Sequence, residues 1–350
     1  MSTKHMNLKR ISHRVKEEVS STMEVAKVVG IKGAFASFRG KVDIQIMVHN
    51  GHIEHPWIRR HLLKKHEAMN AYFEKVFTEF NENGVQKVHI PKQDENYKDC
   101  IWICWWQGLE NAPDIVKKCV ESIQIHAGNH KVVIITDENY KKFVTFPTWI
   151  EEKYRSGIIT RTHLSDLLRI SLLAQYGGIW LDSTFFCVGN LEPYFSMPIW
   201  SIKRPDYRHV SVSCGEFANY SFGCTTEYRK VFAILLEYLL NYWKNYDYMI
   251  DYLFLDYLIV LARKQNTYVN QVFNKIIPNN KNCDELLKVL GNEFDSAKWE
   301  KLRDNTVLFK LTWKADFPKI VNGKKTYYGE IMNGELNVSA LSGGVLTKNV

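Results

Sequence analysis

The chain has 350 residues, of which 45% are hydrophobic and 13% aromatic, and it carries a formal net charge of +8. This length and hydrophobic content are enough for a full globular core, which excludes an intrinsically disordered protein. No apolar run reaches the roughly 18 residues of a membrane span, and the N-terminus lacks the apolar centre of a signal peptide. Seven cysteines without a C-x-x-C pair are expected to be packing residues in a reducing cytoplasm, not a disulfide framework or a metal site.

The net charge lies in the N-terminal part of the chain. Residues 1–66 hold 13 Lys or Arg against 5 Asp or Glu, which accounts for the whole of the +8. Such a segment binds anionic lipid or nucleic acid, and we favour a membrane surface because no nucleic-acid motif is present. We interpret residues 1–97 as a basic helical appendage. Its amphipathic stretch, residues 55–80, either lies on a bilayer or packs on the body of the protein, and packing is the more common outcome.

Strands and helices alternate from residue 101 onward. The pattern predicts a buried strand over residues 101–106, a helix over 113–127, a strand over 131–136 and another helix from residue 138. Further along, it predicts a loop at 190–198, a strand within 200–203, and helices at 226–243, 248–257 and 283–300. The alternation indicates an α/β fold with a mainly parallel sheet flanked by helices, whose ligands bind at the carboxyl ends of the strands.

The stretch 162–184 combines regular structure with chemistry. Thr162 is expected to cap a helix that a Gly-Gly pair ends, because glycine readily adopts the left-handed conformation that stops a helix. A short buried strand follows, with Asp182 at its end and Thr184 two residues later. The strand end therefore carries a carboxylate and a hydroxyl at the edge where ligands bind.

Two charged residues lie on the preceding helix. Asp166 and Arg169 are three residues apart, so they share one face of a helix that is otherwise nearly all apolar. Burying an unpaired charge is costly, so these side chains either pair with each other or face a polar site. A plain ion pair is the simpler reading for an arbitrary helix, but the carboxylate of Asp182 at the next strand end favours a site.

The segment SDLLRISLLAQYGGIWLDST, residues 165–184, resembles the core of the DXD-motif sugar-transferase superfamily of GT-A type, which includes α-mannosyltransferases and glucosylating toxins. Within it the chain is most similar to the bacterial capsular polysaccharide synthesis protein family. The resemblance implies a GT-A-like, Rossmann-type domain over residues 98–320. The glycines, asparagines and lysines that follow predict a loose C-terminal tail at 321–350. The resemblance also implies that Asp166 and Arg169 hold hydroxyls of a donor sugar.

The resemblance implies a nucleotide and a metal ion as well. A divalent cation, Mn²⁺ or Mg²⁺, is expected on the donor diphosphate at Asp182 and at Thr184, which stands where D-x-D has its second acid. Trp105 is expected to stack on the nucleotide base, with Trp106 as the alternative, because adjacent strand residues face opposite sides of a sheet. Gln107 lies in the turn that follows.

Two later segments add candidates. A C-terminal segment that covers the diphosphate in the superfamily matches Thr312, Trp313 and Lys314, although a lysine-flanked strand explains the pattern nearly as well. Two acids, Asp251 and Asp256, lie in an aromatic-rich stretch, where rings can stack on sugars and carboxylates can accept from hydroxyls. Buried tyrosines are the more common meaning of such a stretch. We take Asp256 as a further catalytic candidate, in addition to Asp166 and Arg169.

The resemblance implies a hexosyltransferase that moves a sugar from a nucleotide-diphosphate donor, expected to be a UDP-sugar, with retention at the anomeric carbon. The expected acceptor is an oligosaccharide, linked to polyprenyl diphosphate, in capsular or extracellular polysaccharide synthesis. Such an enzyme is expected in the cytoplasm, peripheral on the inner face of the cell membrane. The missing second acid favours one rival, a catalytically inactive sugar-nucleotide-binding or scaffolding relative. The basic charge alone favours another, a nucleic-acid-binding protein.

Overall fold

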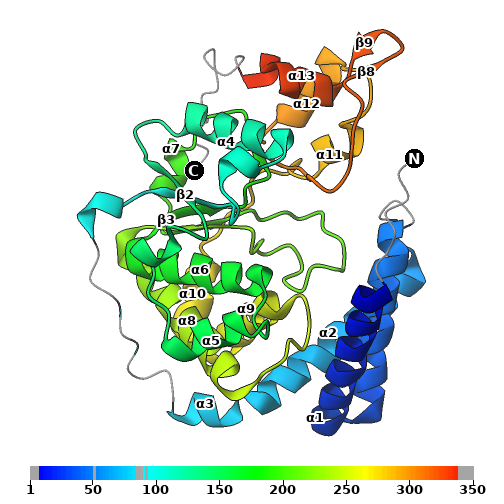
Figure 1. Cartoon of the computed structure of the whole chain (residues 1–350), viewed down its shortest axis with the longest axis vertical. Coiled ribbons are helices and arrows are strands. Elements are labelled where there is room, and N and C mark those ends of the chain that lie inside the picture. Colours follow the sequence, from blue (N-terminus) through cyan, green and yellow to red (C-terminus); the bar gives the residue numbers. More distant parts are fainter. Residues whose placement is uncertain (1–7, 50–52, 84–87, 89, 91–93, 338–350) are drawn as a thin grey trace.

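The computed structural model describes residues 8–49, 53–83, 88, 90 and 94–337. Its N-terminal part is helical (Figure 1), with α1 (Leu8–His49), α2 (Pro56–Val76) and α3 (Thr78–Asn83). Gly30, at φ 78°, interrupts α1, and a 2.9 Å ion pair between Lys41 and Glu18 joins the two arms on either side of it. In the described ranges, no helix combines the length and apolar character that crossing a bilayer requires.

Helix α2 packs on the body of the protein. The ring of Phe73 lies 5.7–6.3 Å from three aromatic rings of α8 (Arg229–Asn245) and α9 (Phe254–Gln265). One face of α2 is buried, including Ile58, Leu62, Met69, Tyr72 and Phe73. The expectation that this amphipathic helix packs, and does not lie on a bilayer, is confirmed.

The central sheet has five strands in the order β2–β1–β3–β6–β5. Their bounds are Val132–Ile135, Ile101–Cys104, Gly178–Leu181, Ser221–Cys224 and Ile199–Ser201, in that order. Strands β2 and β3 run parallel to β1, whereas β6 runs antiparallel to both β3 and β5. Only β6 is therefore reversed among these five strands, and the predicted α/β fold with a mainly parallel sheet is confirmed.

Helices lie on both sides of this sheet in Figure 1. On one side are α4 (Asp114–His126) and the short α7 (Glu192–Phe195). On the other are α5 (Thr148–Arg155), α6 (Arg161–Tyr176), α8, α9 and α10 (Thr267–Phe273). Three predictions were wrong in detail: the helix expected from residue 138 is a single 3-10 turn, Tyr140–Lys142, the loop expected at 190–198 contains α7, and the helix expected at 248–257 begins only at Phe254.

The C-terminal part builds a smaller unit above the sheet in Figure 1. There β4 (Phe185–Cys187) pairs with β7 (Leu308–Lys310), and the helix expected over 283–300 is two short ones, α11 (Glu285–Val289) and α12 (Ser296–Arg303). The expected loose tail is folded through residue 337, with β8 (Ile320–Val321), β9 (Lys324–Lys325) and α13 (Tyr327–Asn333). Tyr327 and Ile331 are buried in its core. The rest of that tail, 338–350, lies outside the described residues.

A glycine pair joins α6 to β3 as predicted. Gly177 and Gly178 have φ values of 69° and 77°, where only glycine is unstrained. A Cβ atom on Gly178 would lie 2.2 Å from the carbonyl oxygen of Cys100, so glycine also permits the close approach of β3 to β1. The N-cap lies two residues earlier than expected: Thr160 is the N-cap residue, and Thr162 lies inside the helix.

Candidate functional site

Asp182 follows β3 and is held by groups from three elements. Its Oδ1 accepts a 3.1 Å hydrogen bond from the indole Nε1 of Trp180, and its Oδ2 accepts one of 3.2 Å from the ammonium of Lys310. The Nη2 of Arg169 lies 3.6 Å from Oδ1. Burial alone would raise the pKa of Asp182, but the positive charges of Lys310 and Arg169 outweigh burial and hold that pKa below its usual value. The carboxylate is therefore ionised.

Arg169 connects the two predicted acids of this region. Its Nη2 lies 3.5 Å from Oδ1 of Asp166, and its Nη1 donates a 2.6 Å hydrogen bond to the backbone oxygen of Asn219. The guanidinium also stands over the ring of Trp180, 5.2 Å from the ring centre. Asp166 and Arg169 thus share a helix face, as predicted, and together with Asp182 they form one buried cluster.

Asp256 joins the same cluster through an amide. It lies in the first turn of α9, and its Oδ2 accepts a 2.6 Å hydrogen bond from Nδ2 of Asn219, the residue that also accepts from Arg169. The other candidate, Asp251, precedes α9 and is paired at 2.8 Å with the buried Lys65. Of the two acids, only Asp256 is therefore linked to Arg169 in this way.

Two carboxyl groups of the cluster have raised pKa values. Burial raises the pKa of Asp166 to about 6, although the charge of Arg169 opposes the rise. Burial and the negative charge of Asp166 raise the pKa of Asp256 to about 7. The cluster therefore combines one ionised carboxylate, Asp182, with two that exchange protons near neutral pH, a property common at functional sites.

The two adjacent tryptophans after β1 face different surroundings. Trp106 is buried and donates from Nε1 to the hydroxyl of Ser165 at 2.8 Å. The ring of Trp105 meets that of Trp313 edge to face, with centroids 5.7 Å apart, and its buried Nε1 has no hydrogen-bond partner among the described residues. Trp313 is 47% exposed. Trp105, the residue favoured for base stacking, therefore lies beside a second candidate from the C-terminal segment.

The remaining candidates, from the C-terminal segment and from the turn after β1, lie near the surface. Gln107 and Lys314 are exposed and Thr312 is half-buried, and the Thr312 hydroxyl accepts a 3.1 Å hydrogen bond from the backbone N–H of Lys314. Thr312, Trp313 and Lys314 come shortly after Lys310, the last residue of β7. The segment from Lys310 to Trp313 therefore connects the acidic cluster with the tryptophan pair.

Sequence reasoning missed Lys310, Asn219 and Tyr252. Lys310 belongs to the quoted C-terminal segment, but nothing local distinguishes it from its neighbours. Asn219 bridges Arg169 and Asp256. Tyr252 has 74% of its surface exposed, and desolvation together with the charges of Asp166 and Asp182 raises the pKa of its hydroxyl. An exposed tyrosine next to an acidic cluster is a signal that only the folded chain reveals.

The predicted metal pair, Asp182 and Thr184, does not fit a divalent cation. The Lys310 ammonium donates to both of them, at 3.2 Å to Asp182 Oδ2 and 2.6 Å to Thr184 Oγ1. In the part of the chain that the structure describes, no group of three or more His, Cys, Asp or Glu side chains could hold a metal ion. A divalent ion at this pair would have to displace an ammonium that both oxygens already bind.

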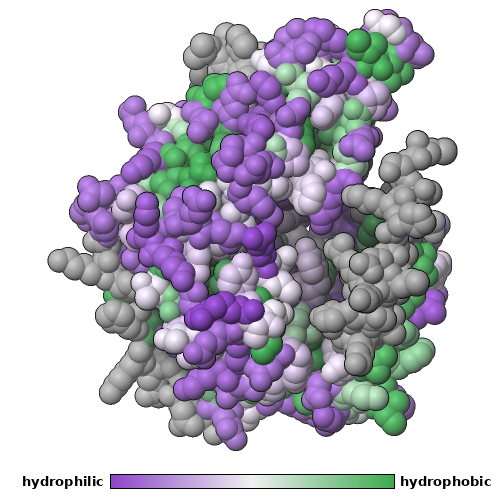
Figure 2. Space-filling view, viewed as in Figure 1, coloured by the Kyte–Doolittle hydropathy of each residue, from purple (hydrophilic) through white to green (hydrophobic). Residues whose placement is uncertain are grey.

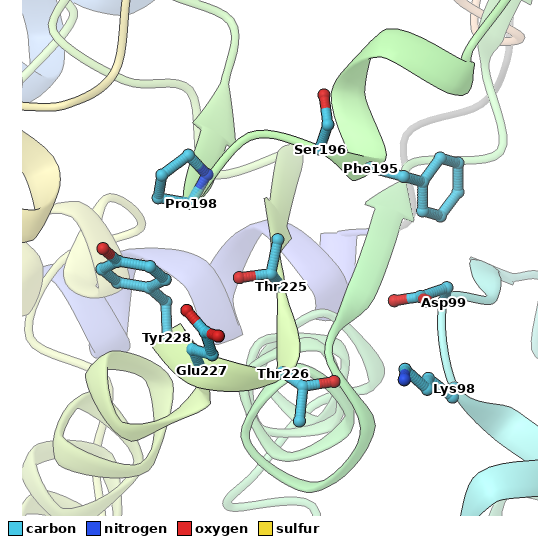
Figure 3. Close-up of a pocket in the computed structure, with 9 residues that line it drawn as sticks. All are labelled: Lys98, Asp99, Phe195, Ser196, Pro198, Thr225, Thr226, Glu227 and Tyr228. Atoms are coloured by element: carbon cyan, nitrogen blue, oxygen red, sulfur yellow. The ribbon is translucent and has the colours of Figure 1, made fainter.

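A cavity of about 380 Å³ lies at the opposite edge of the sheet (Figure 3). It is lined by residues that precede β1 and β5 or follow β6, among them Asp99, Pro198 and Thr225. Because β6 is reversed, its end lies at the amino edge of its neighbours, whereas Asp182 follows the carboxyl end of β3. The cavity is therefore separate from the acidic cluster.

Comparisons with known proteins find two similar O-glycosyltransferases. The chain is 33% identical over 101 residues to the O-glycosyltransferase PaGT of Phomopsis amygdali, covering 26% of this chain and 25% of the relative. It is 27% identical over 117 residues to the O-glycosyltransferase braB of Annulohypoxylon truncatum, covering 31% and 27%. The chain thus matches about a quarter of the length of these curated relatives.

A solved structure, PaToxG Glycosyltransferase, aligns with 68% of this chain and 94% of its own, at 16% identity and a TM-score of 0.34. The broadest match is to the family described as "Capsular polysaccharide synthesis protein", over residues 50–331. This match includes α2, the whole sheet, every residue of the acidic cluster and nearly all of α13. The chain belongs to the capsular polysaccharide synthesis protein family.

Proposed function

We propose that this protein transfers a sugar from a nucleotide-diphosphate donor, a UDP-sugar, to a lipid-linked oligosaccharide in capsular or extracellular polysaccharide synthesis. The observation that carries the proposal is the position of Arg169 between Asp166 and Asp182 at the carboxyl edge of the sheet. Its Nη2 lies 3.5 and 3.6 Å from their carboxylates, longer than a good hydrogen bond of about 2.9 Å. Both acids and the guanidinium thus retain capacity to bind sugar hydroxyls. The family and the two O-glycosyltransferase relatives support the same class of reaction.

In this proposal each part of the site binds one part of the donor. Asp166 and Arg169 bind the sugar hydroxyls, because a guanidinium fork and a carboxylate together match neighbouring hydroxyl groups. Asp256 contacts the sugar or the acceptor from the other side of Asn219. Trp105 and Trp313 bind the nucleotide base by stacking, next to Gln107. Thr312 and Lys314 cover the diphosphate. No divalent ion is included, because Asp182 and Thr184 are bound by an ammonium.

The reaction replaces the bond between the anomeric carbon and a phosphate oxygen by a bond to an acceptor hydroxyl oxygen. The anomeric carbon becomes positively charged in the transition state, so the negative charge of Asp182 and of its neighbour Asp166 favours that state. We propose retention at this carbon. The anomeric configuration of the product, read from its proton NMR coupling constant, tests this part separately from the transfer itself.

An acceptor on a membrane agrees with the surface of α1. Its second arm exposes Ile31, Phe35 and Phe38, which are spaced to lie on one helix face and are 83%, 67% and 44% exposed. Figure 2 shows hydrophobic residues at the lower right, where Figure 1 has α1. Lys32, next to Ile31, is exposed, and so is Lys27 on the first arm, before Gly30. Exposed apolar side chains near lysines suit the boundary of an anionic membrane.

The decisive experiment is a screen of UDP- and GDP-sugars for binding and turnover. Thermal melting with each compound identifies the nucleotide, since a ligand that binds only the folded state raises the melting temperature. Turnover is then measured by release of the nucleoside diphosphate with a lipid-linked oligosaccharide acceptor. Binding without turnover on every acceptor would favour the inactive relative that the missing second acid suggests. Absence of binding to all sugar nucleotides would refute the proposal.

A further inference from the structure

Lys310 is fixed beside Asp182 and Thr184 by the backbone of two paired strands. In the register of β4 and β7, Lys310 lies opposite Phe185, the residue after Thr184. The backbone N–H of Lys310 donates to the oxygen of Cys283 at 2.8 Å, and that of the next residue, Leu311, donates to the oxygen of Thr184 at 2.9 Å. Lys310 therefore reaches the acidic cluster from a rigid segment and not from a loop.

The ammonium of Lys310 is held from several directions. It donates to Asp182 Oδ2 at 3.2 Å and to Thr184 Oγ1 at 2.6 Å. The rings of Phe185 and Tyr220 each have their centres 5.4 Å from it. These contacts keep the charge in one place without hydration on those sides, so it is preorganised before any ligand binds.

One donor of this ammonium remains for a ligand. An ammonium has three protons, and the hydrogen bonds to Asp182 and Thr184 use two of them. The Lys310 side chain is 21% exposed, so solvent reaches it. Arg169 supplies a second positive charge on the other oxygen of Asp182. Two cations thus bind Asp182, but Arg169 is shared with Asp166, so the free donor of Lys310 is the group that suits an anionic ligand.

A divalent ion and this ammonium cannot both occupy the space between Asp182 and Thr184. The hydroxyl of Thr184 is a weak ligand for such an ion but a good acceptor for an ammonium. A second aspartate at position 184 would attract a metal ion, whereas with threonine the ammonium of Lys310 lies between the two side chains. The threonine and the lysine are therefore parts of one arrangement.

We propose that Lys310 is a catalytic residue that binds the diphosphate of the sugar nucleotide in place of a divalent metal ion. This proposal rests on the proposed function. As the bond between the anomeric carbon and the phosphate oxygen breaks, its electron pair stays on that oxygen, and Lys310 stabilises the charge that develops. The acceptor oxygen forms the new bond to the anomeric carbon, and its proton ends on the released diphosphate. Lys310 itself keeps its protons throughout.

The first test uses the wild-type protein. Binding of UDP, and of GDP in parallel, is measured by calorimetry in excess EDTA and again with Mn²⁺ or Mg²⁺. Turnover of the sugar nucleotide is measured under the same conditions. We expect the dissociation constant and the turnover rate to change less than about twofold between these conditions. Binding and turnover that vanish in EDTA and return with Mn²⁺ would overturn the role of Lys310 and leave the transferase assignment intact. Failure to bind any nucleotide with or without metal would overturn both.

The second test uses variants in EDTA. Lys310→Met should weaken UDP binding at least tenfold and leave uridine binding unchanged, because only the diphosphate contacts the ammonium. Lys310→Arg, which keeps the charge, should retain part of the UDP affinity. Lys288→Met is the matched control, since Lys288 is an exposed lysine of α11 that forms a surface ion pair with Glu285. Equal UDP affinity in Lys310→Met and wild type would overturn the proposal.

Discussion

The ammonium of Lys65 and the carboxylate of Asp251 form an ion pair of 2.8 Å in which both side chains are almost fully buried. Lys65 belongs to α2, and Asp251 accepts a hydrogen bond from the backbone N–H of Leu253, just before α9 begins. Lys65 also donates to the hydroxyl of Tyr257 on α9. The N-terminal helices are therefore tied to the helix that carries Asp256. These helices help to hold the candidate site in place, in addition to the membrane contact proposed for α1.

Lys65→Met should destabilise the protein by about 3–5 kcal/mol, because it leaves the carboxylate of Asp251 buried without a partner. The measurement is the free energy of unfolding from urea titration. Lys64→Met is the matched control: it removes the neighbouring, exposed lysine and should change stability by less than about 0.5 kcal/mol. The double variant Lys65→Met/Asp251→Leu should recover most of the loss, and a double variant as unstable as the single one would show that the ion pair is not the cause.

Arg169→Lys should lower kcat/KM for the sugar nucleotide more than tenfold, about 1.4 kcal/mol or more. Lysine keeps the positive charge but cannot donate to the Asn219 oxygen while also lying between Asp166 and Asp182. Affinity for UDP alone should stay near wild type, since UDP lacks the transferred sugar that Arg169 would bind. Equal losses for UDP and UDP-sugar would place Arg169 outside the sugar pocket.

The titration of Asp256 should make the free energy of unfolding fall as pH rises from about 4 to about 7. The carboxyl titrates near pH 4 in the unfolded chain and near pH 7 in the folded one, so over this window the folded state holds a proton that the unfolded state has lost. By pH 7 the effect amounts to as much as about 4 kcal/mol. Asp256→Asn should therefore lose less unfolding free energy between pH 4.5 and pH 7.5 than wild type, by urea titration. The exposed Asp304→Asn should follow wild type, and identical slopes for all three proteins would contradict the pKa of Asp256.

Ile31→Asp/Phe35→Asp should weaken binding to vesicles of anionic phospholipid and leave the melting temperature unchanged, because both side chains are exposed on α1. Vesicle flotation at low salt provides the measurement. Ile125→Asp on α4 is the control, as it removes an apolar side chain of similar exposure, 54%, from a helix on the other part of the molecule. Equal flotation of the double variant and wild type would rule out this face as a membrane contact.

Local patterns predicted the parts of the site that are close in sequence. The helix with Asp166 and Arg169, the glycine pair and the strand ending at Asp182 lie within about twenty residues, and their periodicity and turn residues determine their structure. The N-cap position was displaced from Thr162 to Thr160 because either threonine suits a helix start.

Long-range pairing decided the parts that the sequence did not predict. Lys310 and Thr184 are 126 residues apart, and only the register of β4 with β7 brings them together. The tail beyond residue 320 is rich in glycine, asparagine and lysine, which predicted a loose segment. Its few apolar residues, such as Tyr327 and Ile331, nevertheless complete a hydrophobic core with α11 and α12. The average composition of this tail does not reveal that these few side chains pack against another part of the protein.

The pairing of β4 with β7 also sets an order of events during synthesis. Residues 101–187 supply most of the sheet and the Asp182 carboxylate, but Lys310 emerges from the ribosome more than a hundred residues later. At about 5–20 residues per second, a nascent chain exposes the β4 edge, and the Asp182 carboxylate without its lysine partner, for several seconds or longer. During that interval the unpaired strand is open to a chaperone or to aggregation. Competence to bind a sugar nucleotide therefore arrives only with the last quarter of the chain.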